Sequence, residues 1–519
     1  MKNINIKSKK ILYIGLSLLL SLPFAACTDD LNTTPQGPNI ELDPYADASN
    51  YPMLVAKVYA GFSKLGLTGP DGSGDIPSSS DQGKTTFLRT YFNIQELTSD
   101  EAKCAWSDED EKNYSQTFLA PDNYIGYMLY QRCMLNIVFA NEFLKNTVTP
   151  KVEVANLDGL RAQVRTLRAM NYYYLMDVYG NPGWVTEEHP VTYLPEQLGR
   201  EGMFNWIESE LLEVEKGGLL QDYSSSTYGL VTNQLVQSIL AKMYLNAEVY
   251  TGTARWNDAL TYAKKVTSYS GLALESNYQN LFCADNDQSK EIIFTLPYDF
   301  TQAQDWGGMT FVMAASTSGD MTSLLDFNAA WAGNRATQQL TNLFTSTDKR
   351  ALFFKTSRDQ NMTELGNFQK GWSVVKFTNK GWDGADNPNG IGQWTDTDFP
   401  LFRLADIILV QAEAELRLGD SAAALTSYNK VHAHSRTGQS AATSVSLQNI
   451  LDERGRELYW EGQRRTDLIR FGKFATGYNW AWKGGVLNGT DIDKKYELFP
   501  ISTKHLAGNP ALVQNELYK

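Results

Sequence analysis

Several long stretches of the chain place apolar residues three and four positions apart. This is the spacing that puts them on one face of an α-helix. The pattern predicts helices over residues 51–65, 127–145, 160–179, 234–250, 256–269, 404–418 and 421–432. We therefore expect a mainly α-helical fold.

The last four of these helices form two consecutive pairs whose second members are alike. One contains ALTYAKKV from Ala259 and the other ALTSYNKV from Ala424, with five of eight positions identical. Helix pairs too small to bury their own apolar faces stack on one another, as tetratricopeptide repeats do. The repeat is degenerate, but it predicts a scaffold of tetratricopeptide-like helix pairs.

Two segments lack this periodicity. Residues 294–394 are richer in Gly, Asn, Thr and Trp, and residues 68–86 are rich in Gly and Ser. Loops carried by a rigid scaffold often hold binding residues. We expect a loop-rich ligand-binding face here.

The N-terminus has the pattern of an export signal. Four lysines precede a short apolar run over residues 11–22, which is too short to span a bilayer. The Ala25-Ala26-Cys27 sequence that follows resembles a bacterial lipobox, which predicts a signal peptide over residues 1–26 and a lipid on Cys27; an ordinary secretory signal is the alternative. Residues 27–45 are polar and proline-containing and read as a lipidated flexible tether, and residues 46–519 as one helical domain. Asp29-Asp30 is either a solvated part of the tether or an export tag for the outer face of the outer membrane.

Charge and cysteine content restrict the function further. Removal of residues 1–26 takes the formal charge from −13 to −17, which disfavours nucleic acid as a partner. Apart from Cys27, the cysteines are Cys104, Cys133 and Cys283, at spacings that indicate neither a zinc module nor a disulfide framework. One disulfide between two of them remains open.

The sequence holds little that indicates catalysis. The four histidines accompany no serine-hydrolase elbow, zinc-protease motif or P-loop. Glu453, Glu457 and Glu461 recur every fourth residue and are followed by several arginines, a spacing that predicts an acidic helix stripe in a salt-bridge network. We expect a protein that is not an enzyme, with a lipid-anchored glycoside hydrolase as the minor alternative.

Three tryptophans stand among small or polar residues, where burial in the core is not the only explanation. They are Trp106, Trp306 and Trp331. Flat aromatic faces suit the C–H faces of sugar rings, and an arginine such as Arg89 can donate to neighbouring hydroxyls. The pattern favours a carbohydrate platform; the alternative, a helical adaptor that binds only protein, would keep all three in the core.

Longer motifs resemble a known family. LRAQVRTLRAMNYYYLMDVYG, DTDFPLFRLADIILVQAEAEL, ERGRELYWEGQRRTDLIRFG and the ending FPISTKHLAGNPALVQNELYK, with the lipobox, resemble the SusD family of surface-exposed, outer-membrane glycan-binding lipoproteins. The resemblance is closest to the starch-binding member. It implies capture of an α-glucan without cleavage and delivery to a TonB-dependent transporter of the SusC type.

The resemblance also assigns residues. The aromatic arc of the starch-binding member falls on Trp106, Trp306 and Trp331, and its arginine and aspartate on Arg89 and Asp81. Two differences weaken the inference that this protein also binds starch. Cys104 stands where the starch-binding member has a tryptophan, and Glu109 stands where it has a sugar-binding asparagine. Glu109 accepts hydrogen bonds but cannot donate them as an amide does.

A structural calcium site of the same family member falls on Asp287, Asp396 and Asp398. Oxygen ligands at alternate loop positions suit a hard cation. Two solvated acidic turns are the alternative.

Overall fold

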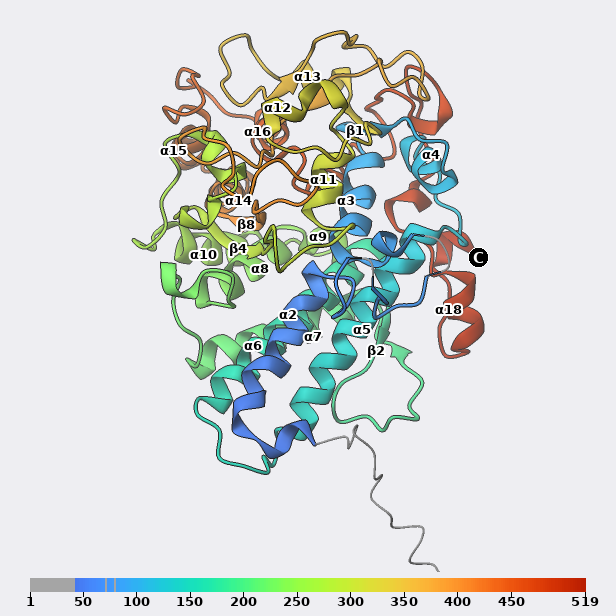
Figure 1. Ribbon diagram of the computed structural model, residues 1–519, viewed down its shortest axis with the longest axis vertical. Helices are drawn as coiled ribbons and strands as arrows, with labels where there is room; N and C mark the ends of the chain where they lie inside the picture. Colours follow the sequence, from blue (N-terminus) through green and yellow to red (C-terminus); the bar gives the residue numbers. More distant parts are fainter. Residues whose placement is uncertain (1–42, 71, 79–80) are drawn as a thin grey trace, which may run out of the picture.

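The structure, a computed structural model, describes residues 43–70, 72–78 and 81–519. The predicted signal peptide, Cys27 and most of the predicted tether lie outside the described residues. Helices make up most of the regular structure, and the strands form short antiparallel pairs (Figure 1). The prediction of a mainly α-helical fold is confirmed.

The longer helices build the scaffold. Their bounds are α2 (Tyr51–Ser63), α3 (Phe87–Leu97), α5 (Tyr124–Asn146), α6 (Leu157–Tyr179), α7 (Arg200–Gly217), α8 (Asn233–Leu245), α10 (Trp256–Thr267), α14 (Leu404–Arg417), α15 (Ser421–His432) and α16 (Leu447–Leu458). The shorter helices are α4 (Glu109–Ser115), α9 (Ala247–Thr251), α11 (Met309–Ala314), α12 (Thr322–Leu325), α13 (Gln338–Thr341), α17 (Arg464–Arg470) and α18 (Thr503–Gly508).

Among the described residues, four antiparallel strand pairs complete the fold. They are β1 (Ala102–Cys104) with β5 (Asn334–Ala336), β2 (Gly183–Trp184) with β3 (Glu196–Gln197), β4 (Ile292–Leu296) with β8 (Phe399–Arg403), and β6 (Phe353–Phe354) with β7 (Ser373–Val374). The β4–β8 pair is buried throughout and joins the start of the loop-rich segment to the helix α14.

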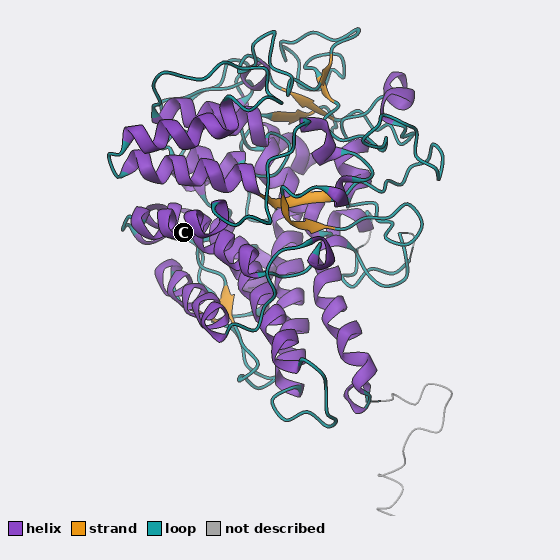
Figure 2. Ribbon diagram, turned by 90° about the vertical axis from the view of Figure 1, so that its left-hand side faces the viewer, coloured by secondary structure: helices purple, strands orange, loops and turns teal. Residues whose placement is uncertain are grey.

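The long helices pack in succession, as stacked helix pairs do. α5 packs on α6 and α6 on α7, while α8 packs on α10, α10 on α14 and α14 on α15. Figure 2 shows most helices running together on one side of the molecule, with many of the loops and short strands at the top and on the other side. The predicted tetratricopeptide-like scaffold with a loop-rich face is confirmed.

The two similar octapeptides lie in equivalent helices. Ala259 and Val266 of α10, and Ala424 and Val431 of α15, are all fully buried. Because α10 packs on α8 and α15 on α14, the shared small residues lie where each pair must approach closely. Helix packing therefore explains the repeated alanine and valine, whereas the repeated threonine and lysine are exposed.

One predicted helix is two. The pattern over residues 234–250 continues without interruption, but α8 ends at Leu245 and α9 follows after Asn246. The Asn246 side chain donates to the carbonyl of Lys242 at 2.9 Å, and its backbone leaves the helical region at φ −92° and ψ 4°. Asparagine competes for backbone hydrogen bonds in this way and ends the helix.

The charged run around residue 457 forms the predicted ion-pair network, with one difference. Glu453 and Glu457 belong to α16, but Glu461 lies beyond its end, where Trp460 takes a positive φ of 65°. The partners also come from elsewhere in the chain: Arg350 pairs with both glutamates of α16. Further buried ion pairs link Glu457 to Arg403 and Arg436, and Glu461 to Arg403 and Lys376.

The cysteine question is resolved for the described residues. Cys104, Cys133 and Cys283 are all unpaired and buried. The part of the chain that the structure covers also has no helix that is both long and apolar enough to cross a membrane.

Candidate functional site

Five residues predicted from the sequence line one cavity. It has a volume of about 430 Å³ and is lined by Asp81, Arg89, Trp106, Asp108, Trp306 and Trp331. The cavity joins the loop before α3, the segment after β1 and two loops of the region 294–394. Residues more than 200 positions apart in sequence thus share one surface.

The tryptophan rings are set at angles to one another rather than parallel. The centroids of Trp306 and Trp331 are 6.1 Å apart with 35° between the ring planes. The ring centroids of Trp306 and Trp394 are 4.4 Å apart, and those of Trp331 and Phe311 are 6.4 Å apart. All three predicted tryptophans are half-buried, so each leaves part of its surface open. Tilted, partly open rings provide a curved apolar wall.

Arg89 is fixed by contacts on several sides. Its Nη1 lies 2.8 Å from Asp81 Oδ2, and its guanidinium carbon lies 4.5 Å above the Phe311 ring. Arg89 is 5% exposed and belongs to α3, whose backbone is tied to the Trp306 loop because Arg89 N–H donates to Gly307 O at 3.0 Å. Ion pairing and ring stacking hold the forked donors at the cavity wall.

Backbone contacts set the positions of the rings. Trp106 Nε1 donates to the carbonyl of Trp331 at 3.1 Å, and the Trp331 N–H donates to Ala314 O, at the end of α11, at 2.9 Å. Gly333 lies directly against the Trp106 indole, and a Cβ there would overlap the ring. The loop Trp331–Gly333 therefore supplies one tryptophan of the cavity and fixes the position of a second, Trp106.

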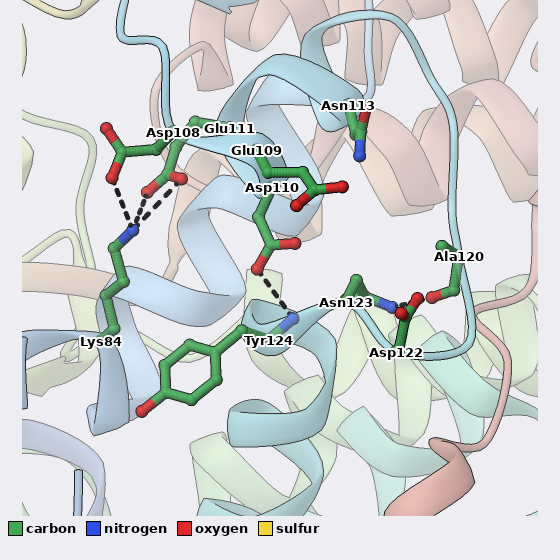
Figure 3. A pocket seen from close by; sticks show the side chains of 10 residues that line it. All are labelled: Lys84, Asp108, Glu109, Asp110, Glu111, Asn113, Ala120, Asp122, Asn123 and Tyr124. Carbon is green, nitrogen blue, oxygen red and sulfur yellow. Dashed lines mark hydrogen bonds and ion pairs between the residues drawn. The ribbon is translucent and has the colours of Figure 1, made fainter. Parts of the chain in front are cut away.

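Glu109 lies outside this cavity. It is the first residue of α4 and faces a neighbouring, polar cavity of about 290 Å³ that shares Asp108 with the aromatic one (Figure 3). There Lys84 Nζ lies 3.3 Å from Asp108 Oδ1 and 3.1 Å from Glu111 Oε1. Burial lowers the pKa of Lys84, and so does the nearby Arg89 guanidinium, but the Glu111 and Asp108 carboxylates together outweigh them and the net shift is upward. The structure thus places Glu109 beside the cavity of the other five residues.

Cys104 is not part of the cavity wall. It ends β1, where it pairs with Asn334, and is fully buried. Burial raises the pKa of its thiol to about 12. The segment two residues later turns outward and carries Trp106 to the surface.

The three predicted calcium ligands line a different cavity. Asp287, Asp396 and Asp398 share a space of about 660 Å³ with several other aspartates. Burial raises the pKa of Asp398 to about 7, and the Asp287 and Asp396 carboxylates add to this shift. Asp398 accepts hydrogen bonds from Tyr298 N–H and Tyr228 Oη–H, both at 2.8 Å.

The donor set fits a hard cation in chemistry but is incomplete in geometry. Carboxylate oxygens are what calcium prefers, and none of the three aspartates forms an ion pair with a described residue. Yet no three His, Cys, Asp or Glu side chains among the described residues are arranged so that they could hold a metal ion. Calcium stays a prediction.

Sequence reasoning missed three residues that shape the aromatic cavity. Asp108 lines it, Phe311 supports both Arg89 and Trp331, and Trp394 packs on Trp306. Trp394 stands among Gln393 and Thr395 and has the same polar surroundings that singled out the other tryptophans. Phe311 lies in the buried helix α11 and has no such signal.

Comparisons with known proteins give the family. The model of the SusD family matches residues 238–518, more than half of the chain. The starch-binding protein SusD of Bacteroides thetaiotaomicron is 30% identical, with 98% of this chain and 99% of that protein covered. A SusD-like protein of Bacteroides ovatus is 25% identical, covering 76% and 80%.

Solved structures share the fold. A SusD superfamily protein from Parabacteroides distasonis has a TM-score of 0.71 at 17% identity, covering 90% of this chain and 98% of that one. Surface glycan-binding protein A from Bacteroides thetaiotaomicron, in complex with laminarihexaose, has a TM-score of 0.68 at 20% identity, covering 90% and 99%. The family model, the full-length relative and the common fold agree: the chain belongs to the SusD family.

Proposed function

We propose that this protein captures a neutral glycan at the cell surface and delivers it to a TonB-dependent transporter without cleaving it. The observation that carries the proposal is the cavity in which Trp106, Trp306 and Trp331 surround the forked donors of Arg89. Aromatic faces take up the apolar side of sugar rings, and the guanidinium donates to their hydroxyls.

A starch-like α-glucan is the first ligand to test. The full-length relative is named for starch binding, and the curved aromatic wall suits a helical glucan. The related structure with bound laminarihexaose makes a β-glucan the second candidate. Glu109 lies beside the cavity and can accept hydrogen bonds from sugar hydroxyls but cannot donate them. Binding of the α-linked and the β-linked glucan should therefore be compared.

Binding fits the cavity better than hydrolysis does. Asp81 is ion-paired with Arg89, and Asp108 with Lys84. A glycosidase needs two carboxyl groups that are free to act on the scissile bond, and both carboxylates that line this cavity are engaged in ion pairs. This argument supports a binding protein over the hydrolase alternative.

The proposal includes a membrane anchor and a partner. Cys27 would carry lipid after removal of residues 1–26 and hold the protein at the outer face of the outer membrane. A SusC-type transporter would receive the glycan. Replacement of Cys27 by alanine is expected to release the protein from membranes, measured by fractionation and metabolic labelling with a fatty acid; retention of labelled Cys27→Ala protein in the membrane would contradict it.

Trp331→Ala is the test of the binding site. Native electrophoresis of residues 40–519 through gels containing amylopectin, laminarin, dextran, fructan or xylan should show retardation by one glucan. Loss of this central ring should weaken binding by at least about 2 kcal/mol, roughly 30-fold. Trp256→Ala, which removes a half-buried tryptophan of α10, is the matched control and should bind normally. Equal retardation of both variants would refute the site.

Calcium at Asp287, Asp396 and Asp398 is a separate proposal with its own test. A structural ion binding only the folded state at 100 times its dissociation constant adds about 2.7 kcal/mol. We expect 5 mM CaCl₂ to raise the melting temperature by a few degrees over EDTA, and Asp396→Asn to remove most of this rise. Asp383→Asn, at the same cavity, is the control. Identical melting curves with calcium and EDTA would exclude the site.

A further inference from the structure

A third cavity continues the aromatic one on the other side of Trp106. It has a volume of about 630 Å³, and Trp106 and Asp108 line both. This volume lies in the range of about 300–1,000 Å³ of small-molecule sites. A polymer that stacks on Trp106 in the first cavity therefore lies next to the second.

The far wall of this cavity carries an exposed aromatic ring. Phe368 is 41% exposed, and Leu365 beside it is half-buried. Both belong to the loop between β6 and β7, in the region 294–394. An exposed phenylalanine facing a cavity that already contains a tryptophan gives that cavity two apolar walls.

The loop that presents Phe368 is held by a buried arginine. Arg335, 1% exposed, donates from Nη1 to the carbonyls of Lys370, at 2.7 Å, and Asn367, and from Nη2 to Leu365 O at 2.8 Å. Three carbonyls within six residues thus converge on one guanidinium. This clamp fixes the loop on both sides of Phe368.

The same strand pair fixes Trp106. Arg335 belongs to β5, where it pairs with Lys103 of β1, and β1 leads directly into Trp106. Ala105 N–H donates to Gly333 O at 2.8 Å, which extends this pairing to the residue before the tryptophan. The β1–β5 strand pair therefore holds both Phe368 and Trp106 in place, which fixes the distance between the two rings.

Polar groups of α4 complete the cavity. Lys112 is exposed and makes no ion pair with any described residue, and Gln116 is half-buried at the end of the helix. An ammonium donates to hydroxyl oxygens, and an amide both donates and accepts. Apolar rings with a few convergent polar groups are the usual make-up of a ligand site.

We propose that this cavity is an additional sugar subsite, occupied by the continuation of the same glycan chain, with Phe368 as its platform and Lys112 and Gln116 as its hydroxyl partners. The proposal rests on the proposed function and extends it: the protein selects long chains over short ones. A trisaccharide would fill the aromatic cavity alone, whereas a heptasaccharide would reach both.

The test compares chain lengths in one protein and its variants. Binding of maltotriose and maltoheptaose is measured by isothermal titration calorimetry, with laminaritriose and laminarihexaose used instead if laminarin is the glucan retained in gels. Wild-type protein should bind the long ligand at least about tenfold more tightly than the short one, with one ligand per protein. Phe368→Ala should remove most of this difference and leave trisaccharide affinity unchanged, while Phe368→Tyr should restore it.

Controls separate this proposal from the one on which it rests. Phe118→Ala removes an equally exposed phenylalanine that does not line the cavity and should behave as wild type. Lys112→Ala should lower only the affinity for the long ligand. Loss of trisaccharide binding in Trp331→Ala supports the proposed function by itself.

Each other outcome overturns the subsite. If Phe368→Ala weakens both ligands equally, the ring belongs to the first site or to the fold. If it weakens neither while Trp331→Ala weakens both, the glycan does not reach the third cavity. Two trisaccharides per protein would show a separate site rather than a continuation.

Discussion

At the scale of single residues, the site depends on a glycine as much as on its tryptophans. Gly333 has no side chain, and the Trp106 indole occupies the space where a Cβ would stand. Gly333→Ala must therefore displace Trp106, which lines both proposed sugar subsites. We expect glycan affinity to fall about tenfold or more, while the melting temperature changes by only a few degrees.

The measurement needs a glycine that tolerates a methyl group. A Cβ at Gly319 would meet nothing within 4 Å, so Gly319→Ala is the matched control. Calorimetry with the glucan that binds, alongside circular dichroism melting, gives both quantities. Unchanged affinity in Gly333→Ala would mean that the position of Trp106 does not determine binding.

Which residues belong to the site could be predicted from the sequence, but how they are arranged in space could not. Trp106, Trp306 and Trp331 stand out in the sequence because each bulky ring occurs among small or polar residues, and these three line one cavity. The exclusion of Glu109 from that cavity depends on where α4 begins relative to β1, which is a tertiary property. The support from Phe311 was invisible because a buried phenylalanine looks like any other core residue.

At the scale of elements, α3 links the site to the core. Arg89 lies near its start and Glu96 near its end, where Glu96 Oε1 accepts from Gly462 N–H at 2.7 Å. Burial raises the pKa of Glu96 to about 7, and burial together with Glu96 raises that of Glu101 well above its usual value. Two carboxyl groups thus share a site that favours protons.

This pair predicts a pH-dependent stability. The folded protein keeps protons that the unfolded chain releases above a pH of about 4.5, so stability falls as the pH rises from there through about 7. Glu101→Gln keeps a donor toward Glu96 but removes one titrating group. We expect the fall in unfolding free energy between pH 5 and pH 8 to be smaller in the variant by about 1 kcal/mol or more.

Urea unfolding at the two pH values measures this difference. Glu109→Gln, an exposed glutamate of α4, controls for the loss of one negative charge and should follow the wild-type protein. Parallel curves for Glu101→Gln and wild type would show that other buried carboxyl groups, such as Asp305 with its pKa raised by burial to about 6, account for the pH dependence.

Most of the longer helices are predictable from the spacing of their apolar residues, whether the helix buries one face, as α10 does, or nearly all of its residues, as α14 does. α15 was predicted with its observed bounds because its apolar residues repeat at helical spacing. α3 is not among the predicted helices, although apolar residues recur in it at helical spacing; its polar residues are buried as well. The composition of residues 294–394 predicts a loop region, but it does not predict β4 and β5, which form through pairing with the distant strands β8 and β1.

At the scale of the whole molecule, charge restricts which glycans fit. The chain carries a formal charge of −13, and the cations at the two neighbouring cavities are already paired: Arg89 with Asp81, and Lys84 with Asp108 and Glu111. Glu109 adds a further exposed carboxylate at the edge. An anionic polysaccharide would meet negative charge without a free cation in these two cavities, which favours a neutral ligand.

We therefore expect polygalacturonate and alginate to cause no retardation in affinity gels in which a neutral glucan does. Salt distinguishes two causes, because the Debye length falls from about 10 Å at 0.1 M to about 3 Å at 1 M. Repulsion by charge would weaken at 1 M NaCl, because the Asp81 and Asp108 carboxylates are about half exposed to solvent, whereas exclusion by the shape of the cavities would persist. We expect the exclusion of anionic polysaccharides to weaken at 1 M NaCl, with neutral-glucan binding almost independent of salt. Strong retardation by an anionic polysaccharide at low salt would contradict the neutral-ligand assignment and direct attention to the unpaired Lys112.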